Sequence, residues 1–159
     1  MDALDRLGLT YEVCPGVSSF CGAAAALRAE YTLPDVSQTV ILTRMEGRTP
    51  VPEREQIESL AAHGATMVIF LSAGQLERLS ARLIEGGYAP ETLAAIVYKA
   101  TWPDEKVVRT TVGGLAEAGA REGITKTALI TVGGFLGDSY ERSKLYDPAF
   151  TTGFREATK

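Results

Sequence analysis

The 159-residue sequence has few of the residues that usually hold metals or form disulfides. It contains two cysteines, Cys14 and Cys21, which do not form a Cys-x-x-Cys pair, and a single histidine, His63. Structural zinc sites generally take four cysteine or histidine ligands at characteristic spacings. We therefore expect no metal site, and we expect both cysteines to be reduced, as is usual in a cytoplasmic protein.

Long apolar runs and an excess of basic residues are also lacking. No run approaches the roughly 18 apolar residues of a membrane-spanning helix, and the opening residues MDALD have neither the basic nor the apolar segment of a secretory signal. The net charge is −4, whereas surfaces that bind phosphate backbones concentrate lysine and arginine. We expect a cytoplasmic protein that binds neither a membrane nor nucleic acid.

The remaining composition is that of a compact domain. Hydrophobic residues make up 45% of the sequence and charged residues 23%, close to the usual mix for a globular protein. A chain of this length buries roughly 68–70% of the surface that it exposes when unfolded. The sequence can therefore build its own hydrophobic core.

Apolar runs alternate with helical patterns along most of the chain. We predict apolar strands over residues 39–43, 67–71, 93–98 and 128–132, and helices over 20–30, 54–63 and 73–85. Residues 39–43 are β-branched or apolar throughout, which predicts a central strand covered on both faces. Residues 9–13, rich in strand formers, predict a further short strand before the Pro15-Gly16 turn.

Residues 106–111 predict one more strand, joined to residues 93–98 by the short segment Trp102-Pro103-Asp104. That connection is too short for a parallel return, so the two strands should be antiparallel. The fold class that follows is α/β: a mixed open sheet with helices on both faces, over residues 1–139. The tail, residues 140–159, loses periodicity, and we expect it to fray.

The segment TVILTRMEGRTPVP, residues 39–52, is the first candidate for a binding site. A strand that ends at Thr43-Arg44 places both side chains at the carboxyl edge of the sheet, where open α/β sheets bind ligands. Arg44 and Arg48 could clamp carboxylates there with charge-assisted hydrogen bonds. The alternative is a solvated turn in which Glu46 offsets the arginines.

Two other segments also allow more than one interpretation. Lys99 and Trp102 follow the strand at 93–98, which brings a cation and a large aromatic ring to what could be the same edge. Ser18 and Ser19 stand at the start of a helix, where hydroxyl side chains commonly cap free amides. Helix capping is enough to explain the presence of Ser18 and Ser19 at this position. The alternative is that they contact a ligand.

Several segments together resemble a known family. CPGVSSFCGAAAA, TLPDVSQTVILTRMEGRTPVPE, FLSAG, VYKATWPDEKVVRTTV and ALITVGG occur in this order. They resemble the carboxyl-terminal half of the precorrin-4 C-11 methyltransferases, a branch of the tetrapyrrole methylases of cobalamin biosynthesis. The match runs from about residue 9 to residue 137. TRMEGRTPVPE and YKATWPDEKVVRTT are specific to this branch, whereas PGVSS is shared by the wider superfamily.

The resemblance implies a two-lobed, homodimeric enzyme. Such an enzyme transfers a methyl group from S-adenosylmethionine to C-11 of a precorrin macrocycle, leaving S-adenosylhomocysteine, with both ligands between the lobes. Because transfer depends on aligning the methyl group with an electron-rich ring carbon, we assign no catalytic base. The macrocycle carries many carboxylates, which gives Arg44 and Arg48 a role in substrate binding, and we also expect Lys99 and Trp102 to contact the substrate.

Cofactor contacts are implied by position within the family's motifs. They are Ser18, Ser19, Leu71, Ala94, Ala95, Thr127 and Ala128. Small residues suit the close approach of the backbone to adenine and ribose. Leu71 departs from a methionine that is common elsewhere in the superfamily.

One departure from the family is large. The glycine-rich loop of GxGPGD type and the later GDP-containing loop of the family's amino-terminal half do not occur here. We therefore expect the amino-terminal lobe to be absent from this sequence, and we expect the chain alone to be inactive. Two alternatives stay open: a stand-alone module that binds a small molecule, and a protein-interaction domain without catalysis. Titration with S-adenosylmethionine distinguishes them, because only the module should bind it.

Overall fold

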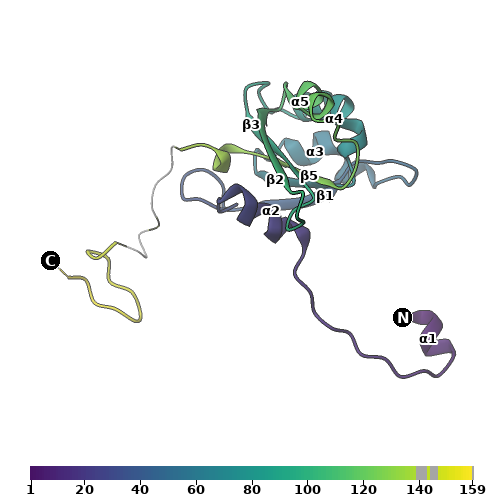
Figure 1. The fold of residues 1–159 in the computed structure, drawn as a ribbon. Helices are drawn as coiled ribbons and strands as arrows, with labels where there is room; N and C mark the ends of the chain where they lie inside the picture. The colour runs from purple at the N-terminus through teal and green to yellow at the C-terminus, as the bar shows by residue number, and fades with distance from the viewer. Residues whose placement is uncertain (139–142, 144–146, 159) are drawn as a thin grey trace.

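The computed structural model describes residues 1–138, 143 and 147–158. Its centre is a five-stranded sheet in the order β1-β2-β5-β3-β4, with helices on both faces (Figure 1). The strands are β1 Val40–Arg44, β2 Thr66–Phe70, β3 Leu93–Tyr98, β4 Lys106–Thr111 and β5 Ala128–Val132. The predicted mixed α/β sheet is confirmed, and the bounds of β3, β4 and β5 are those expected from the sequence.

Strand directions decide which loops meet. β1 and β2 are parallel, β5 is antiparallel to both β2 and β3, and β4 is antiparallel to β3. The carboxyl ends of β1, β2 and β3 therefore lie at the same edge of the sheet as the amino ends of β4 and β5. The antiparallel pairing of β3 with β4 confirms the prediction from their short connection.

The helices form two layers. α3 Ile57–Ala61, α4 Leu76–Glu85 and α5 Leu115–Arg121 cover one face, and α2 Ser19–Leu27 covers the other (Figure 1). Short 3₁₀ turns, η1 Glu53–Glu55, η2 Ala73–Gln75 and η3 Gly134–Leu136, flank these elements, and α1 Asp2–Arg6 lies near the amino terminus. No helix in the described part of the chain is long and apolar enough to cross a membrane.

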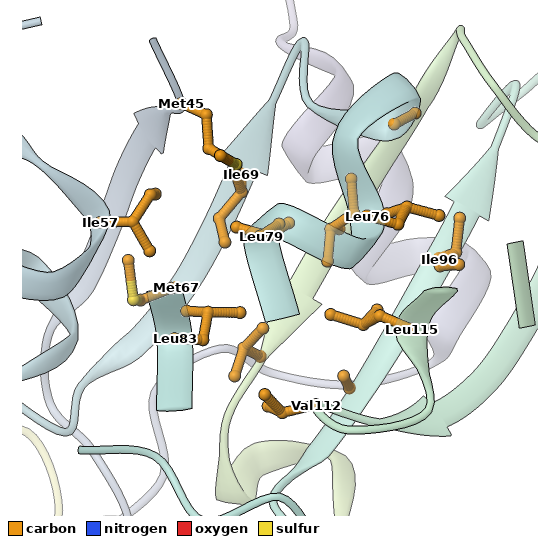
Figure 2. Packing of buried hydrophobic residues seen from close by; sticks show 14 of the residues in the cluster. Met45, Ile57, Met67, Ile69, Leu76, Leu79, Leu83, Ile96, Val112 and Leu115 are labelled. Carbon is orange, nitrogen blue, oxygen red and sulfur yellow. The ribbon is translucent and has the colours of Figure 1, made fainter. Parts of the chain in front are cut away.

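The larger core lies between the sheet and α3, α4 and α5. Figure 2 shows Met67 and Ile69 of β2 packed with Leu79 and Leu83 of α4, and all four side chains are fully buried. Alternate residues of a strand point to opposite faces, so Val68 packs on the α2 side instead. Burial of one such side chain contributes about 1.5–3 kcal/mol, which makes this layer the main source of stability.

The smaller core lies under α2. Ala23 and Leu27 pack against the sheet, and the hydroxyl of Tyr31 donates a hydrogen bond to the Phe20 carbonyl at 2.8 Å. The Arg109 guanidinium of β4 donates to the carbonyl oxygens of Leu27 at 3.0 Å and Leu136 at 3.2 Å. The carboxyl end of α2 is thereby hydrogen-bonded to β4, an edge strand of the sheet.

Two predictions about strands are wrong. Residues 9–13 form no strand: this stretch belongs to an exposed arm, residues 1–17, that extends away from the sheet (Figure 1). A strand needs a hydrogen-bonding neighbour, and none of the described residues supplies one here. β1 is an edge strand and not a central one, and its Leu42 is 48% exposed. An apolar run indicates that the side chains of a strand favour burial. It does not indicate whether the strand has one neighbouring strand or two.

Helix predictions were correct in place but not in detail. The expected helices at 54–63 and 73–85 each begin with a 3₁₀ turn before α3 and α4. The expected helix at 20–30 ends at Leu27, because Arg28 takes a left-handed conformation with φ 53°. α5 was not predicted. Of the expected tail, residues 140–142, 144–146 and 159 lie outside the described residues.

Candidate functional site

A pocket opens at the edge where β1, β2 and β3 end. Its volume is about 330 Å³, and it lies between the start of α2, the segment after β2, the turn after β3 and the segment before β5. Its lining residues are Ser19, Phe70, Leu71, Ala73, Gly74, Val97, Lys99, Ala100, Trp102, Thr125, Lys126, Thr127, Ala128 and Leu129. Most of these side chains are small or apolar, as in most pockets for small organic ligands.

The backbone at this edge is strained. Leu71, Lys99, Thr101 and Thr127 all have positive φ, between 47° and 72°, a conformation that non-glycine residues seldom adopt. Such strain persists only where the surroundings hold it, and it gathers at functional sites. Here the Lys99 amide donates to the Thr127 carbonyl at 2.9 Å, which joins two of the strained positions. The left-handed turn at Leu71 leaves its side chain 84% exposed.

The start of α2 forms one wall. Ser18 is the N-cap residue with an extended backbone, but its side chain makes no capping hydrogen bond, whereas Ser19 lines the pocket. Ser18 is therefore at the expected N-cap position, but its hydroxyl does not make the expected hydrogen bond to a free amide of the helix. A Cβ atom at Gly22 would lie 3.0 Å from Cγ2 of Thr101, so glycine lets α2 pack closely on the turn after β3.

The turn after β3 carries the lysine and the tryptophan. Nζ of Lys99 lies 2.5 Å from Oδ2 of Asp104, 5.1 Å from the Tyr98 ring centre and 5.3 Å from the Trp102 ring centre. The hydrogen bond with Asp104 raises the pKa of Lys99, and the same bond lowers the pKa of Asp104. Both groups are therefore charged at neutral pH. The Lys99 cation already has a partner, whereas Trp102 is 56% exposed at the pocket.

Residues 45–52 form a loop after β1, and the side chain of Arg44, the last residue of β1, is hydrogen-bonded to it. The Arg44 guanidinium donates to the carbonyl oxygens of Met45 at 3.0 Å, Thr49 at 3.3 Å and Pro50 at 3.1 Å. These bonds use the Arg44 side chain to shape the loop, and the expected clamp on carboxylates stays a prediction. Arg48 is exposed, and no ion pair joins it to the described residues.

Glu46 does not offset the arginines of its own loop. Its carboxylate pairs with Arg78 and, at 2.8 Å, with Arg82, both from α4. Arg82 also contacts Glu58 of α3 at 3.1 Å. The loop is thus fastened to the helical layer, and the interpretation in which Glu46 neutralises Arg44 and Arg48 is wrong.

The structure brings together most of the residues expected to bind ligands. Six of them line the pocket: Ser19, Leu71, Lys99, Trp102, Thr127 and Ala128. Ser18 directly precedes this group, and the loop of Arg44 and Arg48 follows β1 at the same edge. Ala94 and Ala95 do not join them. They begin β3 at the opposite edge and are 1% and 0% exposed, packed in the two cores.

The sequence did not point to several lining residues. Ala100 lies in the strained turn after β3, where its small side chain faces the pocket, while Thr125 and Lys126 lie before β5. They meet only because β5 inserts between β2 and β3. The turn YKATWPDE was a usable signal for Ala100, since it follows a strand at the ligand-binding edge. Nothing in the sequence indicated the position of β5.

Comparison with known proteins agrees with the motifs. The family model of the tetrapyrrole (corrin/porphyrin) methylases matches residues 1–116. The cobalt-precorrin-4 C(11)-methyltransferases of Methanocaldococcus jannaschii and Priestia megaterium are 51% and 50% identical over 100% of this chain. The precorrin-4 C(11)-methyltransferase of Mycobacterium tuberculosis is 44% identical over 92% of it. The chain spans 62%, 63% and 59% of these three relatives, about three fifths of their length.

Solved structures show the same similarity. A cobalt precorrin-4 methyltransferase superimposes with a TM-score of 0.83 at 49% identity, over 86% of this chain and 57% of the other. A uroporphyrin-III C-methyltransferase from Thermus thermophilus gives a TM-score of 0.66 at 31% identity, over 85% and 56%. The motifs, the sheet and these similarities agree, and the chain belongs to the tetrapyrrole methylase family.

Proposed function

We propose that the chain supplies one wall of the cleft of an S-adenosylmethionine-dependent methyltransferase that acts on C-11 of a precorrin-4-type tetrapyrrole in cobalamin biosynthesis. One observation carries the proposal. The branch-specific segments at residues 43–53 and 98–111 meet the shared PGVSS segment at one edge of the sheet. Relatives at 51% and 50% identity that carry the C(11)-methyltransferase name support the same reaction.

The pocket fits part of a nucleoside cofactor. Its volume of about 330 Å³ is at the low end of the range for small-ligand sites, and its lining of small and apolar side chains allows a flat base to approach the backbone. Ser19, Leu71, Ala100 and Thr127 would hold the adenosine part. When bound, S-adenosylmethionine supplies an electrophilic methyl group on its sulfonium.

The chain's own residues contribute placement and charge. Arg48 after β1 and Lys126 before β5 are exposed cations without an ion pair among the described residues, and they suit the carboxylates of a macrocycle. Arg44 fixes the shape of the loop that presents Arg48. Holding the accepting ring carbon in line with the methyl carbon and the sulfonium sulfur supplies most of the rate enhancement expected for methyl transfer, so a side chain that acts as a base is not required.

Cofactor binding is the first test. Calorimetric titration with S-adenosylmethionine should give a dissociation constant between micromolar and millimolar, about 4–8 kcal/mol, because one wall makes only part of the contacts. Amide shifts in NMR spectra should gather at Leu71, Ala100 and Thr127. Shifts confined to other parts of the chain would place the cofactor elsewhere, and no binding at millimolar ligand would favour an interaction domain.

Methyl transfer is the second test. The chain alone should not methylate precorrin-4. It should do so when mixed with the part of the Methanocaldococcus jannaschii relative that it does not match. Incorporation of labelled methyl into the tetrapyrrole measures the reaction. Turnover by the 159 residues alone would contradict the two-wall cleft.

A further inference from the structure

Trp102 is the one tryptophan of the sequence, and it is exposed at the mouth of the pocket. Its side chain is 56% exposed although the two cores beside it are closely packed. Trp102 lines the pocket together with Leu71, which is also exposed, and adjoining exposed apolar side chains beside a pocket indicate a surface that a ligand covers.

The turn that carries Trp102 is held by several bonds. The Trp102 amide donates to the Lys99 carbonyl at 2.9 Å, and the Glu105 amide donates to the Trp102 carbonyl at 3.0 Å. The Thr101 amide, in a left-handed residue with φ 72°, donates to the Glu105 carboxylate at 2.6 Å. These bonds fix the backbone of the turn, so little backbone freedom is lost when a ligand covers the ring that the turn carries.

Lys99 contributes to this order and is not a free cation. Its ammonium group bridges the Asp104 carboxylate at 2.5 Å and the face of the Trp102 ring at 5.3 Å. A cation over an aromatic face is attracted by the electrons of the ring. Lys99 therefore fixes the ring to the turn, and its charge is already matched by Asp104.

We propose that Trp102 is a stacking platform for the ring system of the tetrapyrrole, and that Lys99 is a positioning residue that holds the platform in place. This inference rests on the proposed function. A macrocycle of four linked rings with its carboxylate side chains is too large for a pocket of about 330 Å³. It would therefore lie across the mouth, while the pocket takes the smaller cofactor. The exposed ring of Trp102 is at that mouth.

The first experiment measures binding of uroporphyrin, a stable carboxylate-rich tetrapyrrole, by its change in visible absorbance. Trp102→Phe should bind within about threefold of wild type, because a ring remains. Trp102→Leu should bind about tenfold more weakly, the order of loss found where aromatic platforms stack on nucleic-acid bases. An oligoglutamate peptide with as many carboxylates should bind wild type and Trp102→Leu equally.

The second experiment tests Lys99. Lys99→Met should shift the emission of the single tryptophan and weaken uroporphyrin binding about threefold, whereas Lys99→Arg, which retains the cation, should restore both. Arg121→Met is the matched control, since Arg121 is an exposed cation on α5 away from the pocket. A merely structural role for Lys99 would lower thermal stability without changing emission in the folded protein.

The outcomes separate this inference from the proposed function. If S-adenosylmethionine binds and methyl transfer occurs, but Trp102→Leu binds uroporphyrin as wild type does, the platform is wrong and the function stands. A tenfold loss of cofactor affinity in Trp102→Leu, with uroporphyrin affinity unchanged, would mean that the ring stacks on adenine and would overturn the proposal. Failure of wild type to bind uroporphyrin at millimolar concentration would also overturn it.

Discussion

The backbone amide of Met45 lies 3.1 Å from the hydroxyl of Ser72, which itself donates to the Phe70 carbonyl at 2.8 Å. Ser72 is fully buried, and Met45 is 2% exposed in the larger core. One hydroxyl thus joins the segment that leaves β1 to the segment that leaves β2. The loop of residues 45–52 and the strained turn at Leu71 are therefore positioned by the same group.

Replacing Ser72 with alanine should lower the free energy of unfolding by about 1–3 kcal/mol, because the Met45 amide is then buried without an acceptor. Urea denaturation measures the change. Ser59→Ala is the matched control, since the Ser59 hydroxyl makes an exposed bond to the Glu53 carbonyl at 3.4 Å, and its loss should change stability by less than about 0.5 kcal/mol. Equal effects in both variants would contradict the bridging role.

Gly86 fixes how closely α3 and α4 pack. A Cβ atom there would lie 2.5 Å from the Ala61 Cβ and 2.6 Å from the Glu58 carbonyl oxygen. Its φ of −78° suits any residue, so the effect of Gly86→Ala is purely steric. We expect a loss of about 1–3 kcal/mol in the free energy of unfolding. Gly16→Ala, where nothing lies within 4 Å, should leave stability nearly unchanged in the same urea titration.

The fold was largely predictable because its signals are local. The runs that form β2, β3 and β5 are largely apolar, and the short connection between β3 and β4 leaves only an antiparallel pair. The order of strands was not predictable. Whether β1 lies at the edge, and whether β5 inserts between β2 and β3, depends on contacts between residues far apart in sequence.

The position of the pocket was predictable from the sequence, but the contacts of each side chain were not. Residues that follow parallel strands, such as Leu71 and Lys99, meet because strand direction brings them together. Arg44 could not be separated from Arg48 by sequence, because the difference lies in three carbonyl oxygens that the folded loop turns toward Arg44. Ala94 and Ala95 were misplaced by most of a strand's length, from one edge of the sheet to the other.

Two buried tyrosines should make stability fall at high pH. Burial raises the pKa of both Tyr31 and Tyr88 to about 12, from 10.0. The native state then keeps protons that the unfolded state has lost, so stability is complete below pH 10 and falls as the pH rises from 10 toward 12. The loss should be on the order of 2 kcal/mol for each phenol.

Denaturation at several pH values, with ultraviolet absorbance of phenolate, measures this change. Tyr88→Phe should remove one of the late-titrating phenols and reduce the pH dependence by about half. It also removes the hydrogen bond to the Ala65 carbonyl, so the slope with pH is the readout and not the absolute stability. Tyr11→Phe, at an exposed position, should leave the slope unchanged. A flat stability profile between pH 10 and 12 would mean that neither phenol is held neutral.

The last prediction separates the two arginines of the loop after β1. Arg44→Ala removes the bonds to Met45, Thr49 and Pro50, so it should lower the free energy of unfolding by about 1 kcal/mol and loosen the loop. Arg48→Ala should change stability by less than about 0.5 kcal/mol, because Arg48 is exposed and no ion pair joins it to the described residues.

Uroporphyrin binding should depend directly on Arg48 and only indirectly, through the shape of the loop, on Arg44. Arg48→Ala should weaken uroporphyrin binding about fivefold at low salt and reduce its salt dependence, because one charge that we propose to face carboxylates is lost. Arg48→Lys should recover most of this affinity, whereas Arg44→Lys should not recover the loop, since a lysine lacks the planar fork that reaches three carbonyl oxygens. Affinity for S-adenosylmethionine, measured in parallel, should stay within about twofold in the Arg48 variants. If Arg48→Ala weakened cofactor and uroporphyrin binding equally, the loop would belong to the cofactor pocket and not to the surface that meets the macrocycle.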